Sequence, residues 1–469
     1  MNNLLFKNAS EKLKKLTDLL QNSIKGTHFE GKVYYVGGCV RDLLLNREVK
    51  DIDIVVAMRN GGILFATYMA MKNLCFIKGC NPVVFETYGT AKFQLYKDED
   101  LKDIEIECVQ TRKEQYHSES RNPDTVFGTI QEDAKRRDLT INALYYNISD
   151  EKIYDFNGVG FYDIYNQVIR TPSEADLIFS DDPLRILRVI RFSSKLGWGI
   201  DKDTWLGIIK NVDRLSIVSK ERINDELSKI LLCKKPSVGI RKMYYSGVLS
   251  KVLPDIYDTT EVYESKNPMV TTFDHTMDVL DETQPYIESR LAALFHDVGK
   301  IMGDKVKPDN LDEFSADVTA ADLKMMKFPN YIIKSVETAI KYHRVFKQYQ
   351  DGTLPSDKKI RKFINICGKD LGTVVDLMNA NNYHTTYGKK THQVLDILNR
   401  IEELEDIDKM TNVKLPINGK DIMKEFNIKG GPTIGTLLNA VKDSYFENPS
   451  ITKEECLKIA EEKLKSLEK

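Results

Sequence analysis

Two aspartates two residues apart are the clearest candidates for chemistry in this sequence. Asp51 and Asp53 lie in the segment DIDIVV, which alternates polar and apolar residues as a half-buried strand does. Residues two apart in a strand point to the same face, so both carboxylates can bind one metal cluster while Ile52 and Ile54 enter the core. Carboxylate oxygens are the ligands that Mg²⁺ prefers, and such a pair suits phosphoryl transfer, in which the metal activates a hydroxyl and neutralises the leaving pyrophosphate.

A glycine turn and an arginine precede the aspartates in the same short unit. The stretch YYVGGCVRDLLL predicts a strand, a turn at Gly37 and Gly38, and a helix from Val40 to Leu45. Glycines let the backbone approach a triphosphate closely, the helix start offers free N–H groups, and Arg41 adds a charged fork. Taken alone, the Gly-Gly turn could be an ordinary surface turn, and the two aspartates could be solvated acids at a strand end. The glycines, Arg41 and the aspartates fall within one short unit, and this combination favours a nucleotide site.

This segment resembles the signature of class II tRNA nucleotidyltransferases and bacterial poly(A) polymerases, of the polymerase-β superfamily. The resemblance implies a two-metal transfer with Mg²⁺ as the cofactor. It implies that Gly38 and Arg41 contact the incoming triphosphate, and that Asp51 and Asp53 bind the metal.

The family also has a third carboxylate on a neighbouring strand. The segment DIEIECVQTR places Glu105 and Glu107 on one face of a predicted strand. The distance of Glu107 from Arg112 makes it the better match to the family's catalytic acid. Strand glutamates are also commonly just solvated, so the pattern leaves that alternative open.

A second stretch, EDAKRRDLTINALYYN (residues 132–147), resembles the family's ribose-binding motif. Arg137 and Asp138 are predicted to form a charged pair that presents hydrogen bonds to the 2′- and 3′-hydroxyls, with Asn142 at i+4 from Asp138. An ordinary helix start with charged residues is the alternative, and the Asp51 and Asp53 pair favours the functional interpretation.

A third stretch, SDDPLRILRVIRFSSKLGW, predicts a helix with an arginine at every third position. Arg185, Arg188 and Arg191 form one slowly turning ridge. The other side is predicted to carry Ile186, Leu187, Val189, Ile190 and Phe192.

By resemblance, Asp182 and Arg185 match an acid and an arginine that hydrogen-bond the base of the incoming nucleotide. A carboxylate accepts from an exocyclic amino group and a guanidinium donates to ring nitrogens or carbonyls, which admits C or A and disfavours U or G. Arg188 and Arg191 match positions that bind phosphate or the far side of the base. Asp181 stands where the family usually has Glu, which leaves the base choice open.

A candidate second metal site lies farther along the chain. FDHTMDVL and ALFHDVGK supply His275, His296 and Asp297, spaced like the signature of HD-domain phosphohydrolases, and IKYHRVF adds His343. Neutral imidazoles and a carboxylate suit a divalent metal. Asn381 replaces the acid expected to close the set, and loss of an anionic ligand weakens the binding of a hard cation. We therefore expect a degraded site.

The elements that position these residues change character along the chain. The first part mixes strand-like and helical stretches, whereas helical periods dominate after Pro172. The fold class predicted is an α/β polymerase-β-like head on an all-helical body. The predicted domains are a catalytic head at 1–170, a neck for the base and RNA at 171–255, an HD-type domain at 256–408 and a tRNA-binding tail at 409–469.

Composition excludes several other classes. The chain has no run of about 18 uncharged apolar residues and no secretory signal, so we expect a cytoplasmic protein without a membrane partner. Its 68 basic and 70 acidic residues argue against a wholly basic nucleic-acid binder. Seven cysteines without a C-x-x-C pair predict no disulfide framework and no cysteine zinc site.

The resemblance implies the addition of CMP and AMP, from CTP and ATP, to tRNA 3′ ends with release of pyrophosphate. Alternatives within this class are a poly(A) polymerase and an enzyme restricted to CC or to A. Two alternatives come from other classes: an HD phosphohydrolase, and an RNA-binding protein in which both sites are inactive. The intact Asp51, Asp53, Asp182 and Arg185 argue against the inactive RNA-binding protein. The sequence does not determine the oligomeric state.

Overall fold

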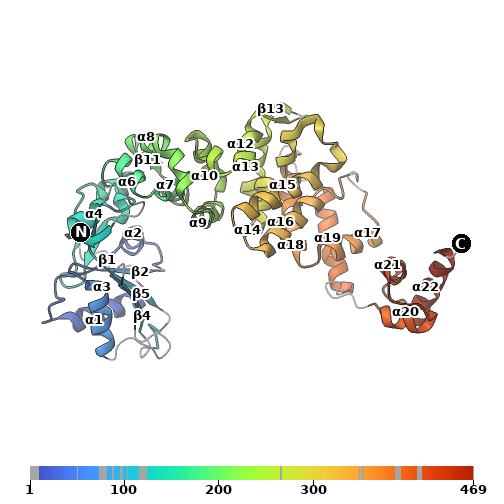
Figure 1. The fold of residues 1–469 in the computed structure, drawn as a ribbon, viewed down its shortest axis with the longest axis horizontal. Coiled ribbons are helices and arrows are strands. Elements are labelled where there is room, and N and C mark those ends of the chain that lie inside the picture. The colour runs from blue at the N-terminus through green and yellow to red at the C-terminus, as the bar shows by residue number, and fades with distance from the viewer. Residues whose placement is uncertain are drawn as a thin grey trace. The chain divides into compact units, whose positions relative to one another are not determined.

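The chain divides into two compact units in the computed structural model. The N-terminal unit contains Met1–Leu227 and Lys242–Val252, and the C-terminal unit contains Ser228–Arg241 and Leu253–Lys469 (Figure 1). The residues that the structure describes are 10–49, 51–72, 82–86, 89–95, 99–102, 104–115, 124–264, 267–347, 349, 353–385, 392–408 and 415–467.

The N-terminal unit is built on a mixed sheet. Its strand order in the described residues is β3-β4-β5-β2-β1-β8-β9. β2 and β5 pair in parallel, whereas the other neighbours pair antiparallel. The strands are β1 (Val33–Val36), β2 (Ile52–Val56), β3 (Val83–Phe85), β4 (Thr90–Gln94), β5 (Glu105–Gln110), β8 (Leu144–Asn147) and β9 (Ile153–Asp155).

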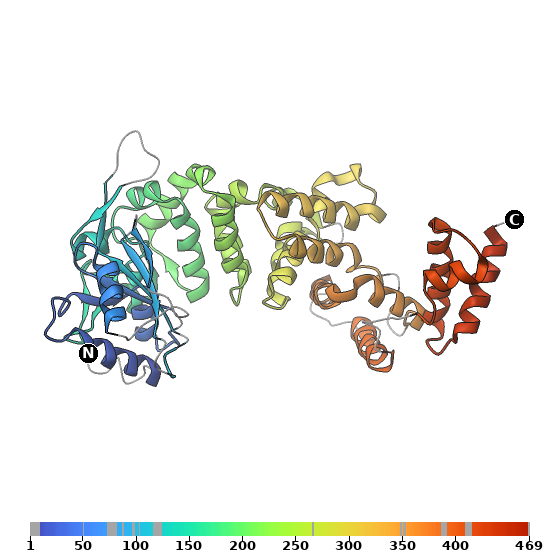
Figure 2. The same cartoon turned by 60° about the horizontal axis from the view of Figure 1, so that its bottom comes forward.

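One face of this sheet is closed by a large apolar core. Helices on this side are α1 (Glu11–Ile24), α2 (Gly38–Leu44) and α3 (Gly61–Met71) (Figure 2). Alternation along β2 points Ile52 and Ile54 into this core, as predicted, so Asp53 points to the opposite face. There α4 (Ile130–Lys135) covers only a smaller apolar cluster that includes Val36 and Tyr145. Polar side chains therefore have room beside it.

Shorter elements complete the N-terminal unit. The helices are α5 (Gly160–Asn166), α6 (Ala175–Asp181), α7 (Leu184–Leu196), α8 (Lys202–Asn211), α9 (Lys220–Leu231), α10 (Pro236–Tyr245) and α11 (Val248–Val252), with α9 and α10 contributing residues to both units. The strands are β6 (Arg112–Gln115), β7 (Asp124–Phe127), β10 (Val168–Ile169) and β11 (Gly199–Ile200).

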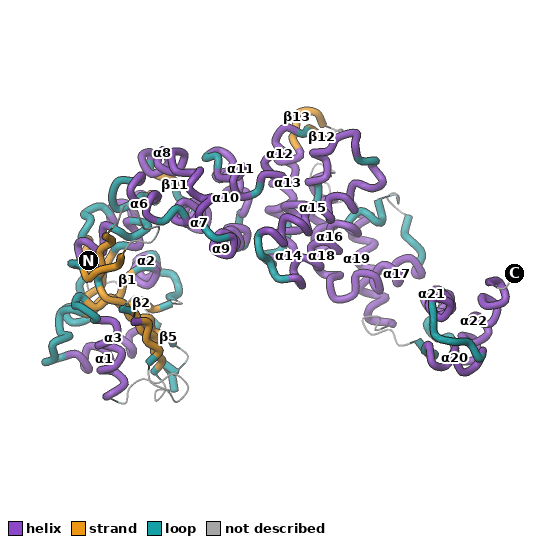
Figure 3. The backbone as a smooth tube through the Cα atoms, in the orientation of Figure 1, coloured by secondary structure: helices purple, strands orange, loops and turns teal. Residues whose placement is uncertain are grey.

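In its described residues, the C-terminal unit consists of helices and loops apart from one short strand pair (Figure 3). The pair is β12 (Tyr263–Glu264) and β13 (Asn267–Thr271). The helices are α12 (Pro254–Asp258), α13 (Thr272–Glu282), α14 (Ile287–Phe295), α15 (Leu311–Met325), α16 (Asn330–Tyr342), α17 (Asp357–Cys367), α18 (Leu371–Thr385), α19 (His392–Asp408), α20 (Gly419–Phe426), α21 (Pro432–Glu447) and α22 (Lys453–Leu467). None of the described helices combines the length and apolar content that crossing a bilayer requires.

The predicted fold class is confirmed: an α/β head is followed by helices. Helix α2 begins at Gly38, earlier than the predicted Val40, because Gly37 adopts φ 73° and turns the chain just before it. The predicted domain boundary at residue 409 lies outside the described residues, and the division into four domains stays a prediction.

Candidate active site

Three charged side chains form a row across neighbouring strands of the sheet. In the strand register Asp53 of β2 is the partner of Glu107 of β5, and Glu107 is the partner of Lys92 of β4. Lys92 Nζ lies 3.2 Å from Glu107 Oε2 and 3.0 Å from Glu105 Oε1. Asp51 is exposed and stands one residue before β2. The structure thus brings Glu107 beside Asp53, although more than fifty residues separate them in sequence.

The charges around Asp53 favour a cation. Burial raises the pKa of Asp53; Arg137 opposes the rise, whereas the neighbouring Glu107 and Asp51 add to it. The negative charges of Glu107 and Asp51 thus disfavour the ionised state of Asp53, and a bound cation removes that cost. The donors are all carboxylate oxygens, which is the chemistry of a hard divalent cation such as Mg²⁺.

Glycine is favoured at position 37, in the turn that leads into α2 and passes Asp53 and Arg137. Its φ of 73° lies in the left-handed region. A Cβ at this position would also lie 3.3 Å from Asp53 Oδ2 and 3.9 Å from Arg137 Nη1. The positive φ therefore favours glycine here, and a Cβ would crowd Asp53 Oδ2 while making only ordinary contact with Arg137 Nη1. Gly38 follows as the first residue of α2.

The predicted pairing of Arg137 with Asp138 is wrong. Arg137 Nε and Nη2 donate to Asp133 Oδ2 at 3.2 and 3.1 Å, and Tyr145 Oη donates to the same oxygen at 2.7 Å. Side chains four residues apart, such as those of Asp133 and Arg137, can meet on a helical turn. Asp133 is fully buried; burial alone would raise its pKa, but Arg137 and then Arg136 outweigh that effect and hold the pKa at about 2.

Asp133→Asn should lower the free energy of unfolding of the N-terminal unit by about 3 kcal/mol, because it leaves buried guanidiniums without their anion. The pKa of Asp133 is lower in the folded protein than in the unfolded chain. Its contribution to the free energy of unfolding is therefore complete above about pH 4 and is lost as the pH falls toward about 2. Both tryptophans of the chain, Trp198 and Trp205, lie in this unit, so urea unfolding can be followed by their fluorescence. An unchanged midpoint at pH 7 would contradict this role.

Asp138 is held by residues of both the sheet domain and α7. Arg188 Nε and Nη2 donate to Asp138 Oδ2 at 2.9 and 2.6 Å, and Asn142 Nδ2 donates to Oδ1 at 3.1 Å. The i+4 spacing of these two residues is thus compatible with a direct hydrogen bond. Arg41 Nη1 in turn donates to Asn142 Oδ1 at 2.7 Å. Burial raises the pKa of Asp138, but Arg188 outweighs it and lowers the pKa to about 2.

Asp182 and Arg185 lie where α6 ends and α7 begins. Arg222 Nη2 donates to Asp182 Oδ2 at 2.9 Å, and the Leu184 backbone N–H donates to Oδ1 at 3.2 Å. Arg185 is buried and its Nη1 donates to the Ile178 carbonyl at 3.3 Å. Protein groups thus orient both side chains.

The arginines of the α7 ridge contact protein groups, although Arg188 remains partly exposed. Arg188 contacts Asp138, and Arg191 Nε donates to Glu226 Oε2 at 2.6 Å. The predicted place of Phe192 on the opposite side is wrong, because its ring centroid is 4.2 Å from Arg191 Cζ. Each residue of an α-helix rotates the side-chain direction by about 100°, so the residue four positions after Arg188 points only about 40° away from it around the helix axis. Phe192 therefore lies beside the ridge.

The candidate second site is assembled in the C-terminal unit. One ligand atom each of His275, His296 and Asp297 lies within 4.8 Å of the others. His296 Nε2 lies 3.2 Å from Asp297 Oδ2, and the His343 ring centroid is 5.6 Å from that of His296. The predicted gathering of these residues is thus present. Burial, and then His296, lowers the pKa of His275 to about 4.

Other groups of this cluster fit a divalent cation poorly. Lys300 Nζ lies 2.7 Å from Asp297 Oδ2, and Arg344 donates to Oδ1. Asn381 contributes only a neutral amide oxygen, 3.1 Å from His275 Nε2. A metal ion would have to displace a lysine or an arginine from a carboxylate whose two oxygens both contact cations.

Chelation should therefore leave the thermal transition of the C-terminal unit unchanged, because Lys300 and Arg344 already supply positive charge to Asp297. Differential scanning calorimetry after dialysis against a chelator, with and without added Zn²⁺ or Mn²⁺, measures this. Arg344→Met should lower the stability by about 3 kcal/mol, since it leaves a buried carboxylate short of one partner. A transition that falls on chelation and recovers with metal would sink this interpretation.

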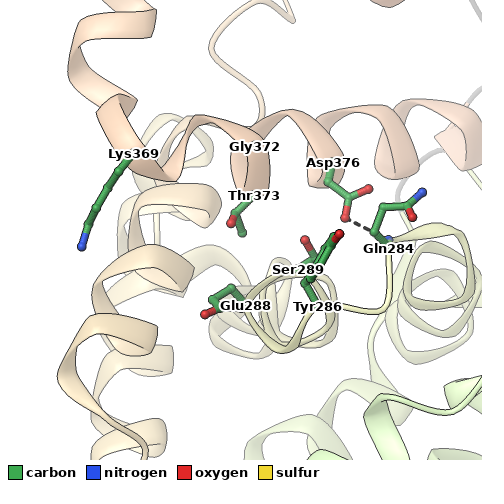
Figure 4. Close-up of a pocket in the computed structure, with 8 residues that line it drawn as sticks. All are labelled: Gln284, Tyr286, Glu288, Ser289, Lys369, Gly372, Thr373 and Asp376. Atoms are coloured by element: carbon green, nitrogen blue, oxygen red, sulfur yellow. Dashed lines mark hydrogen bonds between the residues drawn. The ribbon is translucent and has the colours of Figure 1, made fainter. Parts of the chain in front are cut away.

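A cavity in the C-terminal unit contains none of the predicted site residues (Figure 4). Its volume is about 260 Å³, and the Gln284 backbone N–H donates to Asp376 across its mouth at 2.9 Å. It is lined by Gln284, Tyr286, Glu288, Ser289, Lys369, Gly372, Thr373 and Asp376.

Sequence reasoning missed several side chains around the first site. Lys92 could have been found, because it alternates with the apolar Ala91 and Phe93, which enter the core. Lys92 therefore lies on the opposite face of the sheet, the face that carries Glu107. Asp133 also carries a signal, because arginines follow it at three and four residues. Glu226 carries none, because its contact with Arg191 spans 35 residues of sequence.

Comparison with known proteins matches the region of this site. Residues 33–170 match the family model described as the poly A polymerase head domain. Residues 197–259 match the model described as the probable RNA and SrmB-binding site of polymerase A.

Similar proteins extend over most of the chain. A mitochondrial CCA tRNA nucleotidyltransferase of Candida glabrata is 28% identical, with 90% of this chain and 88% of that protein covered. The CCA-adding enzyme of Streptococcus thermophilus is 27% identical, with 92% and 93% covered. The structure of the Bacillus stearothermophilus CCA-adding enzyme in complex with CTP superposes with a TM-score of 0.68 at 20% identity over 98% of this chain and 99% of that one, which shows a shared fold. The chain thus carries a segment that matches the poly A polymerase head domain, and over most of its length it is similar to CCA tRNA nucleotidyltransferases.

Proposed function

We propose that this protein adds C, C and A to the 3′ end of tRNA, using CTP and ATP and releasing pyrophosphate. The observation that carries the proposal is the strand register of Asp53 with Glu107, next to the glycine turn and the arginines of α7. The names of the relatives from Candida glabrata and Streptococcus thermophilus support CCA addition. A CCA-adding enzyme of the same fold from Thermotoga maritima, in complex with tRNA, supports the RNA substrate (TM-score 0.62).

Asp51, Asp53 and Glu107 would hold Mg²⁺. When bound, the metal lowers the pKa of the attacking hydroxyl and stabilises negative charge on the leaving pyrophosphate. The mutual repulsion of these acids and their oxygen-only chemistry support this assignment. Arg137, oriented by Asp133, keeps a cation beside Asp53.

Gly38 and Arg41 bind the triphosphate in this proposal. Gly37 lets the backbone turn pass close to Asp53, and Arg41 follows in the same helix. Arg41 is buried, and its contacts with Asp42 and Asn142 fix its guanidinium. A preoriented guanidinium binds phosphate at a smaller cost in side-chain entropy.

The sugar and the base are read by separate groups. Arg137, Asp138 and Asn142 bind the ribose hydroxyls. Asp182 and Arg185 hydrogen-bond the base, so the protein itself selects C or A. Arg188 and Arg191 bind phosphate or the far side of the base. The hydrogen bonds of these acids support these roles, because Arg188 lowers the pKa of Asp138 and Arg222 orients the carboxylate of Asp182.

The predicted domains provide a division of labour for this reaction. The head at 1–170 carries out the transfer, the neck at 171–255 reads the base and contacts RNA, and the tail at 409–469 binds tRNA. The HD-type domain at 256–408 acts as a helical body. Cytoplasmic location remains our expectation, although the Candida glabrata relative is named a mitochondrial enzyme.

Incubation with tRNA lacking its 3′ end distinguishes this function from the alternatives. We expect two C residues with CTP alone, and a single further A when ATP is added. Incorporation of C only or of A only, or long A tails, supports the restricted enzymes or a poly(A) polymerase instead. Phosphate release without incorporation supports the HD phosphohydrolase, which the contacts of Lys300 and Arg344 with Asp297 disfavour.

A further inference from the structure

The ring of Phe192 lies among three guanidinium groups. Its centroid is 4.2 Å from Arg191 Cζ, 4.9 Å from Arg41 Cζ and 5.8 Å from Arg188 Cζ. Arg188 and Arg191 belong to the same helix as Phe192, whereas Arg41 comes from α2. A single aromatic side chain thus contacts cations that reach it from two parts of the N-terminal unit.

Each of these arginines is held by an acid on its other side. Arg191 Nε donates to Glu226, Arg188 donates to Asp138, and Arg41 donates to Asp42. The acids take only some of the donors: Arg191 Nη1 and Nη2 have no hydrogen-bond partner among the described residues. These donors remain available to a ligand with negative charge.

Positive charge is concentrated around this ring. The pKa of the nearby Lys195 is lowered, first by burial and then by Arg41. Three guanidiniums around one point repel each other. An aromatic face is electron-rich and attracts cations, and the attraction is largest where water is excluded. Phe192 is only 5% exposed, so its ring meets that condition.

We propose that Phe192 is a positioning residue of the nucleotide site: its ring holds Arg41, Arg188 and Arg191 together in the orientation that binds the incoming nucleotide. The inference rests on the proposed function, because it needs these arginines to bind a nucleoside triphosphate. An aliphatic side chain of similar size would fill the volume but would provide no attraction to the cations. Helical periodicity places Phe192 beside Arg188 and Arg191, but its contact with Arg41 of α2 is visible only in the structure.

The test compares Phe192→Leu with Phe65→Leu, a matched control. Phe65 is fully buried in the core of the same unit, and its described ring contacts are with Phe29 and Phe93. We expect Phe192→Leu to raise the KM for CTP and for ATP about tenfold, with a smaller change in kcat, while tRNA affinity stays as in wild type. Phe65→Leu should lower stability without changing either KM. Equal changes of KM in the two variants would overturn the proposal.

A second series keeps the proposal testable if Phe192→Leu does not fold. Mono-, di- and trifluorinated phenylalanine at position 192 weaken the negative face of the ring while nearly preserving its shape. The KM for CTP should rise stepwise with fluorination, and the thermal transition should change little. A flat series overturns the role of Phe192. Failure of the wild-type protein to incorporate any nucleotide is a different result, which overturns the proposed function instead.

Discussion

Asp53→Ala should abolish nucleotide incorporation while leaving tRNA binding intact. Asp53 lies beside the other charged groups of the site. Glu107 is its partner in the strand register, Arg137 lowers its pKa, and Asp51 raises it. Loss of a metal ligand removes several kcal/mol of charge stabilisation from the transition state, so we expect a rate loss of about 10³-fold or more.

Single-turnover incorporation of CMP, together with a filter-binding or anisotropy measurement of tRNA affinity, separates chemistry from binding. Asp18→Ala is a suitable control, because Asp18 is an exposed aspartate of α1 in the same unit. A metal readout is also available: Mn²⁺ binding followed by electron paramagnetic resonance should weaken in Asp53→Ala and not in Asp18→Ala. Full incorporation by Asp53→Ala would falsify the metal assignment.

Asp182→Ala should relax the choice of base. Asp182 is oriented by Arg222 and by the backbone at the start of α7, so its carboxylate can accept from an exocyclic amino group at a fixed position. Each good hydrogen-bond pair is worth about 1–3 kcal/mol of discrimination, so the preference for CTP and ATP over UTP and GTP should fall by about 10- to 100-fold.

The measurement is kcat/KM for each of the four nucleoside triphosphates with the same tRNA primer. Asp176→Ala is the matched control, since Asp176 is a partly exposed acid of the neighbouring α6 that contacts Lys210. If Asp182→Ala keeps the wild-type preference, base selection belongs to other groups. Loss of activity with all four nucleotides alike would likewise argue against a role in selection.

Buried acids play the same part at several points of the proposed site. Asp133 orients Arg137, Asp138 contacts Arg188, and Glu226 contacts Arg191. In each case burial of the carboxylate is offset by a guanidinium, which is then fixed in direction. Such preorganisation lowers the cost of ordering side chains when a charged substrate binds.

Much of this organisation follows from local sequence. The alternation DIDIVV determines that Ile52 and Ile54 enter the core, and so fixes the face on which Asp53 lies. The i+4 spacing of Asn142 from Asp138 allows the hydrogen bond that the two residues form. The change from mixed strands to helical periods after Pro172 predicts the fold class.

Pairings between distant segments could not be predicted in this way. Sequence spacing suggested Arg137 with Asp138, but Asp133 and Arg188 are the partners that the fold supplies. Phe192 was predicted on the apolar side of its helix, and its contact with Arg41 depends on how α2 and α7 meet.

The sequence by itself determined the face and the chemical type of the residues at the Asp53 site, because these depend on periodicity and composition. Only the tertiary structure decided which acid faces which cation, and that Glu107 lies beside Asp53. It likewise decided that Lys300 and Arg344 contact Asp297, where the sequence suggested a metal. The physical reason is that charge pairing depends on distances of a few ångströms, which strand register and helix packing set between segments far apart in the chain.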